Sequence, residues 1–295
     1  MTTYNGEKYI EEMLESIRNQ TVSADEVLIF DDISKDYTVK IINEFIKKNN
    51  LTNWKVRVNE KNCGWKVNFF EGLKQASGDI IFLADQDDRW HNDKLEKVMN
   101  FFKAKENAWL IATQVNVFSD DGSEVEDMEN VNIEPDGKVI FDNHYYVVKR
   151  PGCSMAMRKE ILPFYFELWN SDMPHDAALW SISNLIGKLY ILDEKLVDYR
   201  RHSSNVTNHL SHNVNQALNS AERTLLISKW YLGTSYADNS KTDCVKSCIK
   251  WCDYRSRLIR QKKLIYFFKL FRYRKHYSYF KRYLGDLYYF FAKLK

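Results

Sequence analysis

Proline and glycine are scarce in this sequence, with 4 and 10 of them among 295 residues. The chain is 44 % hydrophobic and 28 % charged, which is typical of a folded globular protein and excludes a disordered one. No uninterrupted apolar stretch approaches the roughly 20 residues that a membrane span needs. Residues 1–6 lack the basic and apolar regions of a signal peptide. The sequence therefore predicts a cytoplasmic protein with one large domain, or one domain and an appendage.

Cysteine is also scarce, and its five positions lack the spacing that is usual for zinc sites. Cys63 and Cys153 are isolated, whereas Cys244, Cys248 and Cys252 recur at every fourth residue and share one face of a helix. A free cysteine in such a stripe behaves as a small hydrophobic residue. We expect these thiols to pack against neighbouring helices and to carry no chemistry.

The net charge of +3 conceals a division between the two ends of the chain. Residues 255–295 contain 13 Lys or Arg and a single acidic residue, Asp286, so residues 1–254 carry a net charge of −9. An acidic body with a strongly basic tail indicates binding partners and says little about the fold.

Helical and extended patterns alternate through the first half of the chain. Stripes of apolar residues at helical spacing predict helices over residues 7–20, 37–49, 66–76 and 93–105. Short apolar runs predict strands over residues 26–30, 54–58, 80–84 and 109–117. Repeated units of this kind predict an α/β fold, with a parallel-rich sheet and helices on both faces.

The second half of the chain predicts fewer strands. Helices are expected over residues 161–169 and 177–186, and a strand within 190–199. Beyond about residue 206 the pattern is helical only. We therefore expect a catalytic-type α/β domain over residues 1–206 and a helical, basic and aromatic region over residues 207–295.

An abrupt change from apolar to acidic residues is the most informative feature of the chain. The run IIFLA at 80–84 ends in Asp85, Asp87 and Asp88. Alternation along an extended chain places Asp85 and Asp87 on the same side. Clustered carboxylates repel one another unless a cation lies between them, and oxygen ligands suit Mg²⁺ or Mn²⁺. The alternative interpretation is a solvated acidic turn.

A second pair of carboxylates, Asp31 and Asp32, also follows a predicted strand. Ligands of open α/β sheets collect at the carboxyl ends of strands, so the two acidic positions support a common site. The alternative is a turn with a helix cap. A sheet of this type normally opens with an apolar strand, yet here the loop begins at Met1, so we expect the first strand to be missing from this numbering.

Six segments in order resemble glycosyltransferases of family 2, which have the GT-A fold of nucleotide-diphospho-sugar transferases. They are TYNG at 3–6, VLIFDDIS at 27–34, NCG at 62–64, SGDIIFLADQDDRW at 77–90, HD at 175–176 and YRRH at 199–202. Within the family, the sequence DQDDRW at 85–90 looks most like that of bacterial rhamnosyltransferases. The resemblance covers about residues 2–207 and implies transfer of a sugar from a nucleotide diphosphate to a hydroxyl, with inversion.

The resemblance also implies roles for individual residues. Asp87 is the direct metal ligand, and Asp85 contacts the ribose or a water bound to the metal, which is Mg²⁺ or Mn²⁺. His202 completes the coordination, unless it belongs to a solvated basic turn with its neighbours. Asp176, at the start of a helix, is the general base, and the alternative for His175 and Asp176 is a helix cap.

The donor nucleotide requires further contacts. By resemblance, Asp31 accepts a hydrogen bond from a uracil or thymine N–H group. Lys66 approaches the phosphates, unless it is simply a surface residue. Trp90 either stacks on a sugar or packs in the core. The residues expected to bind the donor are Thr3, Tyr4, Asn5, Asp31, Asn62, Lys66 and Asp85.

Aromatic and basic residues interleave over residues 264–295, where Gly285 is the expected helix interruption. A helix of this kind suits the anionic inner face of a membrane. The alternatives are a helix packed on the rest of the chain and, with no recognition motif to support it, a nucleic-acid contact; we expect no nucleic-acid partner.

Together these features predict an inverting glycosyltransferase that uses dTDP-rhamnose or a UDP-sugar. The acceptor is expected to be a cell-surface glycan or a lipid-linked acceptor. Two alternatives stay open. One is an N-terminally truncated, catalytically degenerate nucleotide-sugar binder or subunit, and the other is a peripheral membrane protein that acts through its basic tail.

Overall fold

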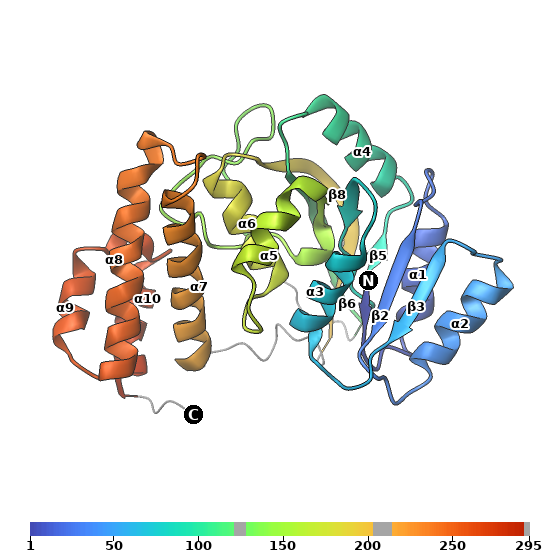
Figure 1. Cartoon of the computed structure of the whole chain (residues 1–295), viewed down its shortest axis with the longest axis horizontal. Coiled ribbons are helices and arrows are strands. Elements are labelled where there is room, and N and C mark those ends of the chain that lie inside the picture. Colours follow the sequence, from blue (N-terminus) through green and yellow to red (C-terminus); the bar gives the residue numbers. More distant parts are fainter. Residues whose placement is uncertain (121–127, 203–213, 292–295) are drawn as a thin grey trace. The chain divides into compact units, whose positions relative to one another are not determined.

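The computed structural model describes residues 1–120, 128–202 and 214–291 (Figure 1). The chain divides into two compact units. The first unit contains residues 1–139, 149–179 and 188–202, and the second unit contains residues 140–148, 180–187 and 203–295. The domain boundary predicted near residue 206 lies outside the described residues.

Three parallel strands form the first sheet of the first unit. In the order of the sheet they are β1 (Thr2–Thr3), β2 (Val27–Asp31) and β3 (Trp54–Val58). Helices α1 (Ile10–Arg18) and α2 (Thr38–Lys48) pack on one face of this sheet, the face that carries the Ile29 side chain of β2. Helix α3 (Trp65–Gln75) covers the other face, where a Cβ at Gly72 would lie 3.2 Å from the Phe30 ring. Helices on both faces are therefore confirmed.

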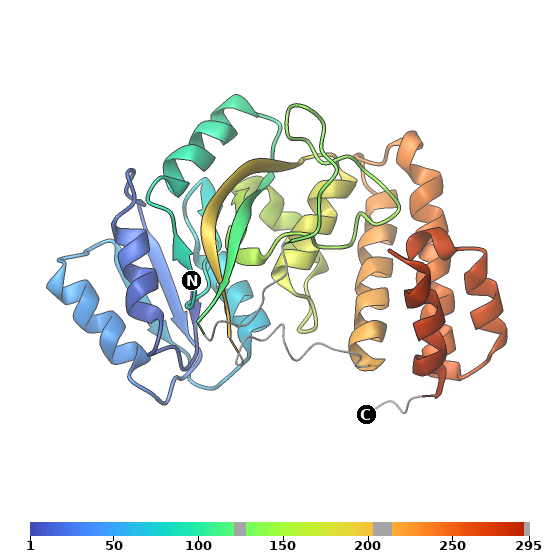
Figure 2. The ribbon, with the colours of Figure 1, turned by 180° about the vertical axis from the view of Figure 1, so that it is seen from behind.

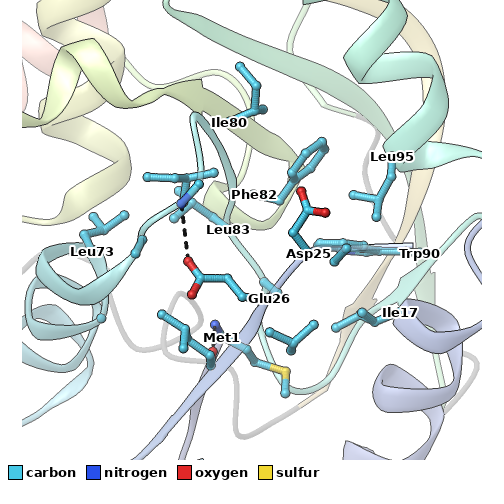
Figure 3. A pocket seen from close by; sticks show the side chains of 18 of the residues that line it. Met1, Ile17, Asp25, Glu26, Leu73, Ile80, Phe82, Leu83, Trp90 and Leu95 are labelled. Carbon is cyan, nitrogen blue, oxygen red and sulfur yellow. Dashed lines mark hydrogen bonds between the residues drawn. The ribbon is translucent and has the colours of Figure 1, made fainter. Parts of the chain in front are cut away.

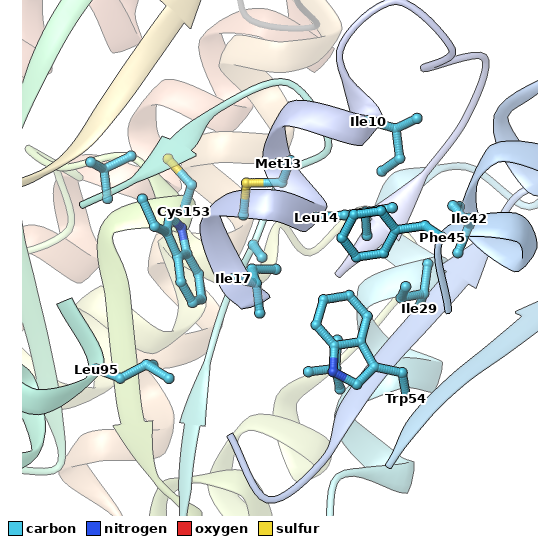
Figure 4. Packing of buried hydrophobic residues seen from close by; sticks show 14 of the residues in the cluster. Ile10, Met13, Leu14, Ile17, Ile29, Ile42, Phe45, Trp54, Leu95 and Cys153 are labelled. Carbon is cyan, nitrogen blue, oxygen red and sulfur yellow. The ribbon is translucent and has the colours of Figure 1, made fainter. Parts of the chain in front are cut away.

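The apolar stripe of α1 explains why that helix packs on the sheet. Ile10, Met13, Leu14 and Ile17 follow the spacing of one helical face, and all four are buried. Their side chains meet Ile29 of β2 together with residues of α2 and β3 (Figure 4). Burial of this stripe, rather than helix propensity, holds α1 in place.

A two-residue strand, β1, is formed by residues that were expected to belong to the first loop. Thr2 is opposite Phe30 and Thr3 is opposite Asp31 in a parallel register. The Phe30 N–H donates to the carbonyl of Met1 at 3.0 Å, so the ladder continues to the first residue. The residues that open the first loop thus also form the edge of the first sheet.

Five strands form a second, mixed sheet in the same unit. In the order of the sheet they are β4 (Ile80–Phe82), β7 (Met155–Arg158), β6 (Leu110–Ser119), β8 (Leu189–Arg201) and β5 (Arg89–Trp90). β4 pairs antiparallel with β7, whereas the long strands β6 and β8 run parallel (Figure 2). The expectation of one parallel-rich sheet is therefore wrong beyond β3. β4 finds its partner about 75 residues later in the chain, and local periodicity carries no signal for that pairing.

Three further helices follow α3 along the chain. They are α4 (Lys94–Ala104), α5 (Leu162–Leu168) and α6 (His175–Leu185). Two 3₁₀ turns, Gly152–Ser154 and Lys159–Ile161, flank β7. His175 and Asp176 are the first two residues of α6, so both side chains belong to the helix N-terminus.

The second unit is helical. Its main helices are α7 (Val214–Leu232), α8 (Asn239–Gln261), α9 (Ile265–Phe271) and α10 (Phe280–Phe291). Cys248 and Cys252 of α8 are fully buried, which confirms the packing stripe. Among the described residues, no helix combines the length and the apolar character that a membrane span requires.

The helix interruption expected at Gly285 is wrong. α10 runs through Gly285, and the break falls earlier, at the 3₁₀ turn Arg274–His276. Asp286 also differs from a typical charge in a basic tail, because it is wholly buried. The Arg255 Nε atom donates to both of its oxygens at 3.0 Å, and the Tyr277 hydroxyl donates at 2.5 Å. These contacts neutralise the one acidic residue of the tail inside the second unit.

Candidate functional site

The acidic turn, residues 85–88, connects β4 to β5. Asp88 is buried, and Asp85 and Asp87 are half-buried. Burial raises the pKa of Asp85 well above its usual range, and the charges of Asp88, Asp87 and Asp176 raise it further. Burial and then the charge of Asp87 raise the pKa of Asp88 to about 7. Carboxylates that disfavour each other's ionisation in this way are stabilised by a bound cation.

The atoms of the acidic turn fit a divalent metal. The Oδ2 atom of Asp88 is buried and has no hydrogen-bond partner among the described residues. One ligand atom each from Asp85, Asp88 and Cys153 lie within 4.8 Å of one another. Burial and the nearby charge of Asp88 raise the pKa of the Cys153 thiol well above its usual range, so the thiol stays neutral and is a poor ligand for a hard cation. Oxygen ligands from the carboxylates suit Mg²⁺ or Mn²⁺.

His202 meets Asp87 from the end of β8. Its Nε2 atom lies 2.8 Å from the Oδ2 atom of Asp87, so the two residues expected to bind the metal are in contact. Arg200 is 5 % exposed, which overturns the interpretation of its segment as a solvated basic turn. Its Nε atom donates to the carbonyl of Asp87 at 2.8 Å, and its backbone N–H donates to Asp88 at 3.0 Å. Arg200 therefore fixes the conformation of the acidic turn.

Lys94 supports the acidic turn from the protein interior, a role that was not predicted from the sequence. Its side chain is fully buried, with Nζ 3.8 Å from the ring centroid of Trp90. The ammonium donates to the carbonyl of Cys153 at 2.7 Å. Burial lowers its pKa to about 7, against the opposing charges of Asp88 and Asp85. Trp90 is itself 6 % exposed, so it packs in the core and does not stack on a sugar.

Asp176 is electrostatically coupled to the acidic turn, because its charge contributes to the raised pKa of Asp85. It is half-buried and accepts a hydrogen bond from the Ala177 N–H at 2.7 Å. The preceding His175 is buried against Phe69, with ring centroids 3.8 Å apart. Burial lowers the pKa of His175 to about 4, so this ring is neutral near pH 7. Asp176 is thus the ionisable group that this end of α6 presents.

Thr3 and Asp31 lie together at the carboxyl ends of β1 and β2. The Thr3 hydroxyl donates to Asp31 at 2.8 Å, and the Ser34 N–H and hydroxyl donate to it at 2.8 and 2.5 Å. Asp31 is wholly buried, and both of its oxygens accept these hydrogen bonds from the protein. A nucleobase N–H therefore reaches this carboxylate only after a neighbouring side chain, such as that of Thr3 or Ser34, moves.

Gln86 joins the first loop to the acidic turn. Its side chain accepts from the Tyr4 N–H at 2.8 Å and donates to the Tyr4 carbonyl at 3.0 Å. The Tyr4 side chain is 45 % exposed, and Asn5 has a positive φ of 48°. The Asn5 N–H donates to the Ser34 hydroxyl at 2.8 Å. The structure therefore brings the expected residues Thr3, Tyr4 and Asn5 next to the acidic turn, through a glutamine that the sequence did not single out.

Asp32 organises the loop that carries Asn62. Although burial opposes its ionisation, hydrogen bonds from the Cys63 N–H, the Asn59 side chain and the Gly64 N–H lower the pKa of Asp32. Gly64 has a φ of 80°, which glycine adopts without strain. The Asn62 amide donates to the carbonyl of Asp32 at 3.2 Å.

Lys66 follows this loop on α3. Its ammonium lies 3.7 Å from a carboxylate oxygen of Asp172, and its side chain is 28 % exposed. No contact with the acidic turn is recorded for this side chain among the described residues. The ion pair of Lys66 is thus with Asp172, in the loop before α6, and not with a carboxylate of residues 85–88.

With this geometry in view, the chain belongs to glycosyl transferase family 2, whose family model matches residues 1–166. It is similar to a dTDP-rhamnosyl transferase of Shigella flexneri, RfbG, with 28 % identity over 243 residues, which is 78 % of this chain and 80 % of the relative. It is also similar to TuaG, a Bacillus subtilis glycosyltransferase named for teichuronic acid biosynthesis, with 27 % identity over 201 residues, 67 % of this chain and 76 % of the relative.

Solved structures support the same fold. TarS 1–349 of S. aureus in complex with UDP-GlcNAc matches with a TM-score of 0.65 and 18 % identity, over 92 % of this chain and 77 % of that chain. The mannosyltransferase PcManGT of Pyrobaculum calidifontis, in complex with GDP-Man and Mn²⁺, matches with a TM-score of 0.53 and 14 % identity, over 92 % and 71 %. The predicted GT-A fold and the membership of family 2 are confirmed, and the chain is a glycosyltransferase, similar to a rhamnosyl transferase.

Proposed function

We propose that this enzyme is an inverting glycosyltransferase that transfers rhamnose from dTDP-rhamnose, or another sugar from a UDP-sugar, to a hydroxyl of a cell-surface glycan or lipid-linked acceptor. The observation that supports this most directly is the coupling of Asp176 to the acidic turn. It supports the proposal that a candidate base and a candidate cation site act in one reaction. The Shigella flexneri relative suggests the rhamnose donor.

In the proposed reaction, Asp176 accepts the proton of the acceptor hydroxyl. The acceptor oxygen forms a bond to the anomeric carbon as the bond from that carbon to the diphosphate breaks. The nucleoside diphosphate leaves with the bonding electron pair, and attack from the opposite face inverts the configuration. Asp87 and His202, with Asp85 beside them, would hold a Mg²⁺ or Mn²⁺ ion, whose charge would neutralise that of the departing diphosphate.

The donor nucleotide lies, in this proposal, against Thr3, Tyr4, Asn5, Asn62 and Asp31. Asp31 binds the nucleobase in one of two ways. It accepts a hydrogen bond from the nucleobase itself after Thr3 or Ser34 moves, or it holds the side chains of Thr3 and Ser34, which then contact the nucleobase. Lys66 reaches the phosphates only after leaving Asp172. Two of the expected donor contacts therefore require small side-chain movements when the nucleotide binds.

A donor-hydrolysis panel tests the proposal. We expect Mn²⁺- or Mg²⁺-dependent release of nucleoside diphosphate from one donor among dTDP-rhamnose, UDP-sugars and GDP-mannose, and chelation by EDTA should abolish it. Release from dTDP-rhamnose alone would identify the donor. A folded protein that neither binds nor cleaves any of these donors would contradict the proposal and favour the alternative of a catalytically degenerate binder.

We also propose that α9, the turn after it and α10 contact an anionic membrane surface. Apolar side chains on these helices face solvent instead of the protein: Phe268 is 63 % exposed, Ile265 55 % and Phe280 55 %. Exposed cations lie between them, including Lys269 and Arg272. Because Asp286 is buried in its ion pair, no described carboxylate offsets this charge within residues 255–291. Exposed aromatic and cationic groups together suit anionic lipids.

Vesicle sedimentation tests the membrane contact. We expect the protein to bind vesicles with about 30 mol % anionic lipid at least about tenfold more tightly than neutral vesicles, with weaker binding at about 0.5 M salt. The double variant Ile265→Ser and Phe268→Ser should lose about tenfold in affinity, because both side chains leave water on binding. Leu226→Ser, at a 40 % exposed apolar residue of α7, is the matched control and should change little. Equal binding by wild type and double variant would contradict the contact.

A further inference from the structure

The loop that follows the carboxyl end of β2 contains a strained residue, Ile33. Its φ of 61° lies in the left-handed region, where Cβ comes close to a backbone carbonyl oxygen. The other described residues with a positive φ are Asn5, Asn50, Lys262 and three glycines, so Ile33 is the only β-branched residue among them. Glycine and asparagine adopt this conformation more readily than a β-branched residue does, so the presence of isoleucine here requires an explanation.

Ile33 lies outside the apolar interior of the first unit. Glu26, just before β2, lines an apolar cavity together with Leu73 of α3 and Ile80 of β4 (Figure 3). Ile33 follows the opposite end of β2, and its side chain is 37 % exposed. Among the described residues, the cluster of buried side chains around Ile29 does not include Ile33. Core packing therefore does not account for the strained conformation.

Hydrogen bonds on both sides of Ile33 hold the loop in this conformation. Before Ile33, the carboxylate of Asp32 accepts from the N–H groups of residues 63–64 at 2.9 and 2.8 Å. After Ile33, the Ser34 N–H donates to the carboxylate of Asp31 at 2.8 Å. A strained residue persists only where its surroundings determine its conformation, and such residues cluster at functional sites and ligand clamps. The strain at Ile33 thus indicates a functional role for its side chain.

The chain neighbours of Ile33 contact two loops that carry expected donor residues. The Ser34 hydroxyl accepts from the Asn5 N–H at 2.8 Å, in the loop after β1. The Asp32 carbonyl accepts from the Asn62 amide at 3.2 Å, in the loop after β3. Because β1, β2 and β3 are parallel, these three loops meet at the same edge of the first sheet. Ile33 therefore lies in the middle one of the three loops.

A nucleobase site combines apolar contact to the faces of the ring with polar contact to its edge. In the proposed donor site, Asp31 is the polar group and Tyr4 is the aromatic one, with a side chain that is 45 % exposed. The Gln86 side chain bonds both the N–H and the carbonyl of Tyr4, at 2.8 and 3.0 Å, so the backbone that carries this ring is fixed. Ile33 adds an exposed aliphatic side chain to the same edge of the sheet.

We propose that Ile33 is a nucleobase-binding residue, whose side chain packs on the pyrimidine ring of the donor while Asp31 lies at the edge of the ring. The exposed part of the Ile33 side chain leaves water when the nucleotide binds, and the resulting gain in affinity accounts for a strained isoleucine at an exposed position. This inference rests on the proposed function, because it takes the donor to be a dTDP-sugar or a UDP-sugar. It concerns donor affinity and not the chemical step.

Calorimetric titration of the full chain with dTDP and with UDP, in the presence of Mn²⁺, tests this role. We expect Ile33→Asn to weaken the binding of both nucleotides by about tenfold, because the variant removes the apolar contact. The same variant should raise Tm by about 2 °C, because asparagine adopts a positive φ at lower cost. Donor affinity and thermal stability should therefore change in opposite directions, which loss of a merely structural contact would not produce.

Three controls accompany this variant. Ile33→Val keeps a branched aliphatic side chain and should bind dTDP within about threefold of wild type. Val22→Asn, at a 45 % exposed β-branched residue between α1 and β2, should leave dTDP affinity unchanged and Tm within about 1 °C. Inorganic pyrophosphate, which has no base, should bind wild type and Ile33→Asn equally.

Four outcomes would overturn the nucleobase contact. Equal dTDP affinity of wild type and Ile33→Asn would show that Ile33 does not touch the base. A fall in Tm together with the loss of affinity would show that Ile33 supports the loop instead of the ligand. An equal loss of pyrophosphate affinity would place the contact at the diphosphate. Wild-type protein that binds neither dTDP nor UDP would overturn the proposed donor as well, so the two failures are distinguishable.

Discussion

Replacing Asp176 with asparagine is expected to lower the rate of sugar transfer by about a thousandfold and to leave donor binding within about twofold of wild type. Asparagine has nearly the same shape as aspartate and still accepts the hydrogen bond from the Ala177 N–H. It cannot take a proton from the acceptor hydroxyl. The loss should therefore fall on kcat, with Tm unchanged, and single-turnover transfer with a calorimetric donor titration measures both effects.

Two companion variants sharpen the assignment of Asp176. Glu160→Gln removes an exposed carboxylate from the 3₁₀ turn after β7 and should leave the rate within about twofold, because surface substitutions away from a site have small effects. His175→Gln addresses the neighbouring residue. Since burial lowers the pKa of His175 to about 4, its ring carries no charge at pH 5–8, and the pH profile of wild type should contain no step from it.

The result that would contradict this assignment is a folded Asp176→Asn variant that keeps more than about a tenth of the wild-type rate. Loss of donor binding in the same variant would also contradict it, because Asp176 would then belong to the nucleotide or metal site. If His175→Gln alone abolishes transfer with unchanged Tm, the proton acceptor lies one residue earlier than proposed.

Local periodicity predicted most elements of this fold. The helix expected over residues 37–49 is Thr38–Lys48, and the strand expected over residues 109–117 is Leu110–Ser119. Such elements are visible because one face of each is buried, and burial imposes a period of 3.6 or 2 residues on the sequence. The carboxyl ends of β2 and β4, where the site lies, followed from the same pattern.

Long-range pairing could not be predicted in the same way. The antiparallel partner of β4 is β7, and nothing near Ile80 in the sequence indicates it. The two-residue strand β5 is too short to show a period. Lys94 was also missed, because a lysine at the start of a helix is normally exposed, and only the packing of Trp90 and the Cys153 carbonyl around it gives it a buried place.

The site residues show a similar division. Asp85 and Asp87 were chosen because carboxylates follow a predicted strand there, and Asp176 was chosen through the family resemblance; the charges of Asp87 and Asp176 both contribute to the raised pKa of the Asp85 carboxyl. Arg200 and Gln86 were passed over. Their roles depend on hydrogen bonds to backbone atoms more than 80 residues away in the chain, which a local motif does not record.

Replacing Asp87 with alanine is expected to abolish metal-dependent donor cleavage, with a loss of at least about a thousandfold. The variant removes one carboxylate from the acidic turn, and with it the contact of the His202 Nε2 atom at 2.8 Å. Donor binding in the presence of Mn²⁺ should weaken at least about tenfold, because the diphosphate loses the cation that neutralises it. Binding in EDTA should be similar for variant and wild type, since both then lack the metal.

Variants of the acidic turn can show which of its carboxylates binds the metal. Asp88→Asn should relieve part of the repulsion that raises the pKa of Asp85, yet keep the bond from the Arg200 N–H. If Asp87 is the direct ligand, Asp88→Asn retains more metal affinity than Asp87→Ala. Asp136→Asn, at an exposed loop carboxylate of the same unit, is the control and should bind Mn²⁺ and donor as wild type does.

The opposite ranking would relocate the metal. If Asp88→Asn loses Mn²⁺ binding and Asp87→Ala keeps it, the cation lies with Asp85 and Asp88, whose ligand atoms the structure already places within 4.8 Å of each other and of Cys153. His202 would then position Asp87 through their mutual contact and would bind no metal. His202→Ala separates the two arrangements, because it lowers Mn²⁺ affinity only when the imidazole is a ligand. The order of the three affinities therefore decides which carboxylates hold the cation that the departing diphosphate requires.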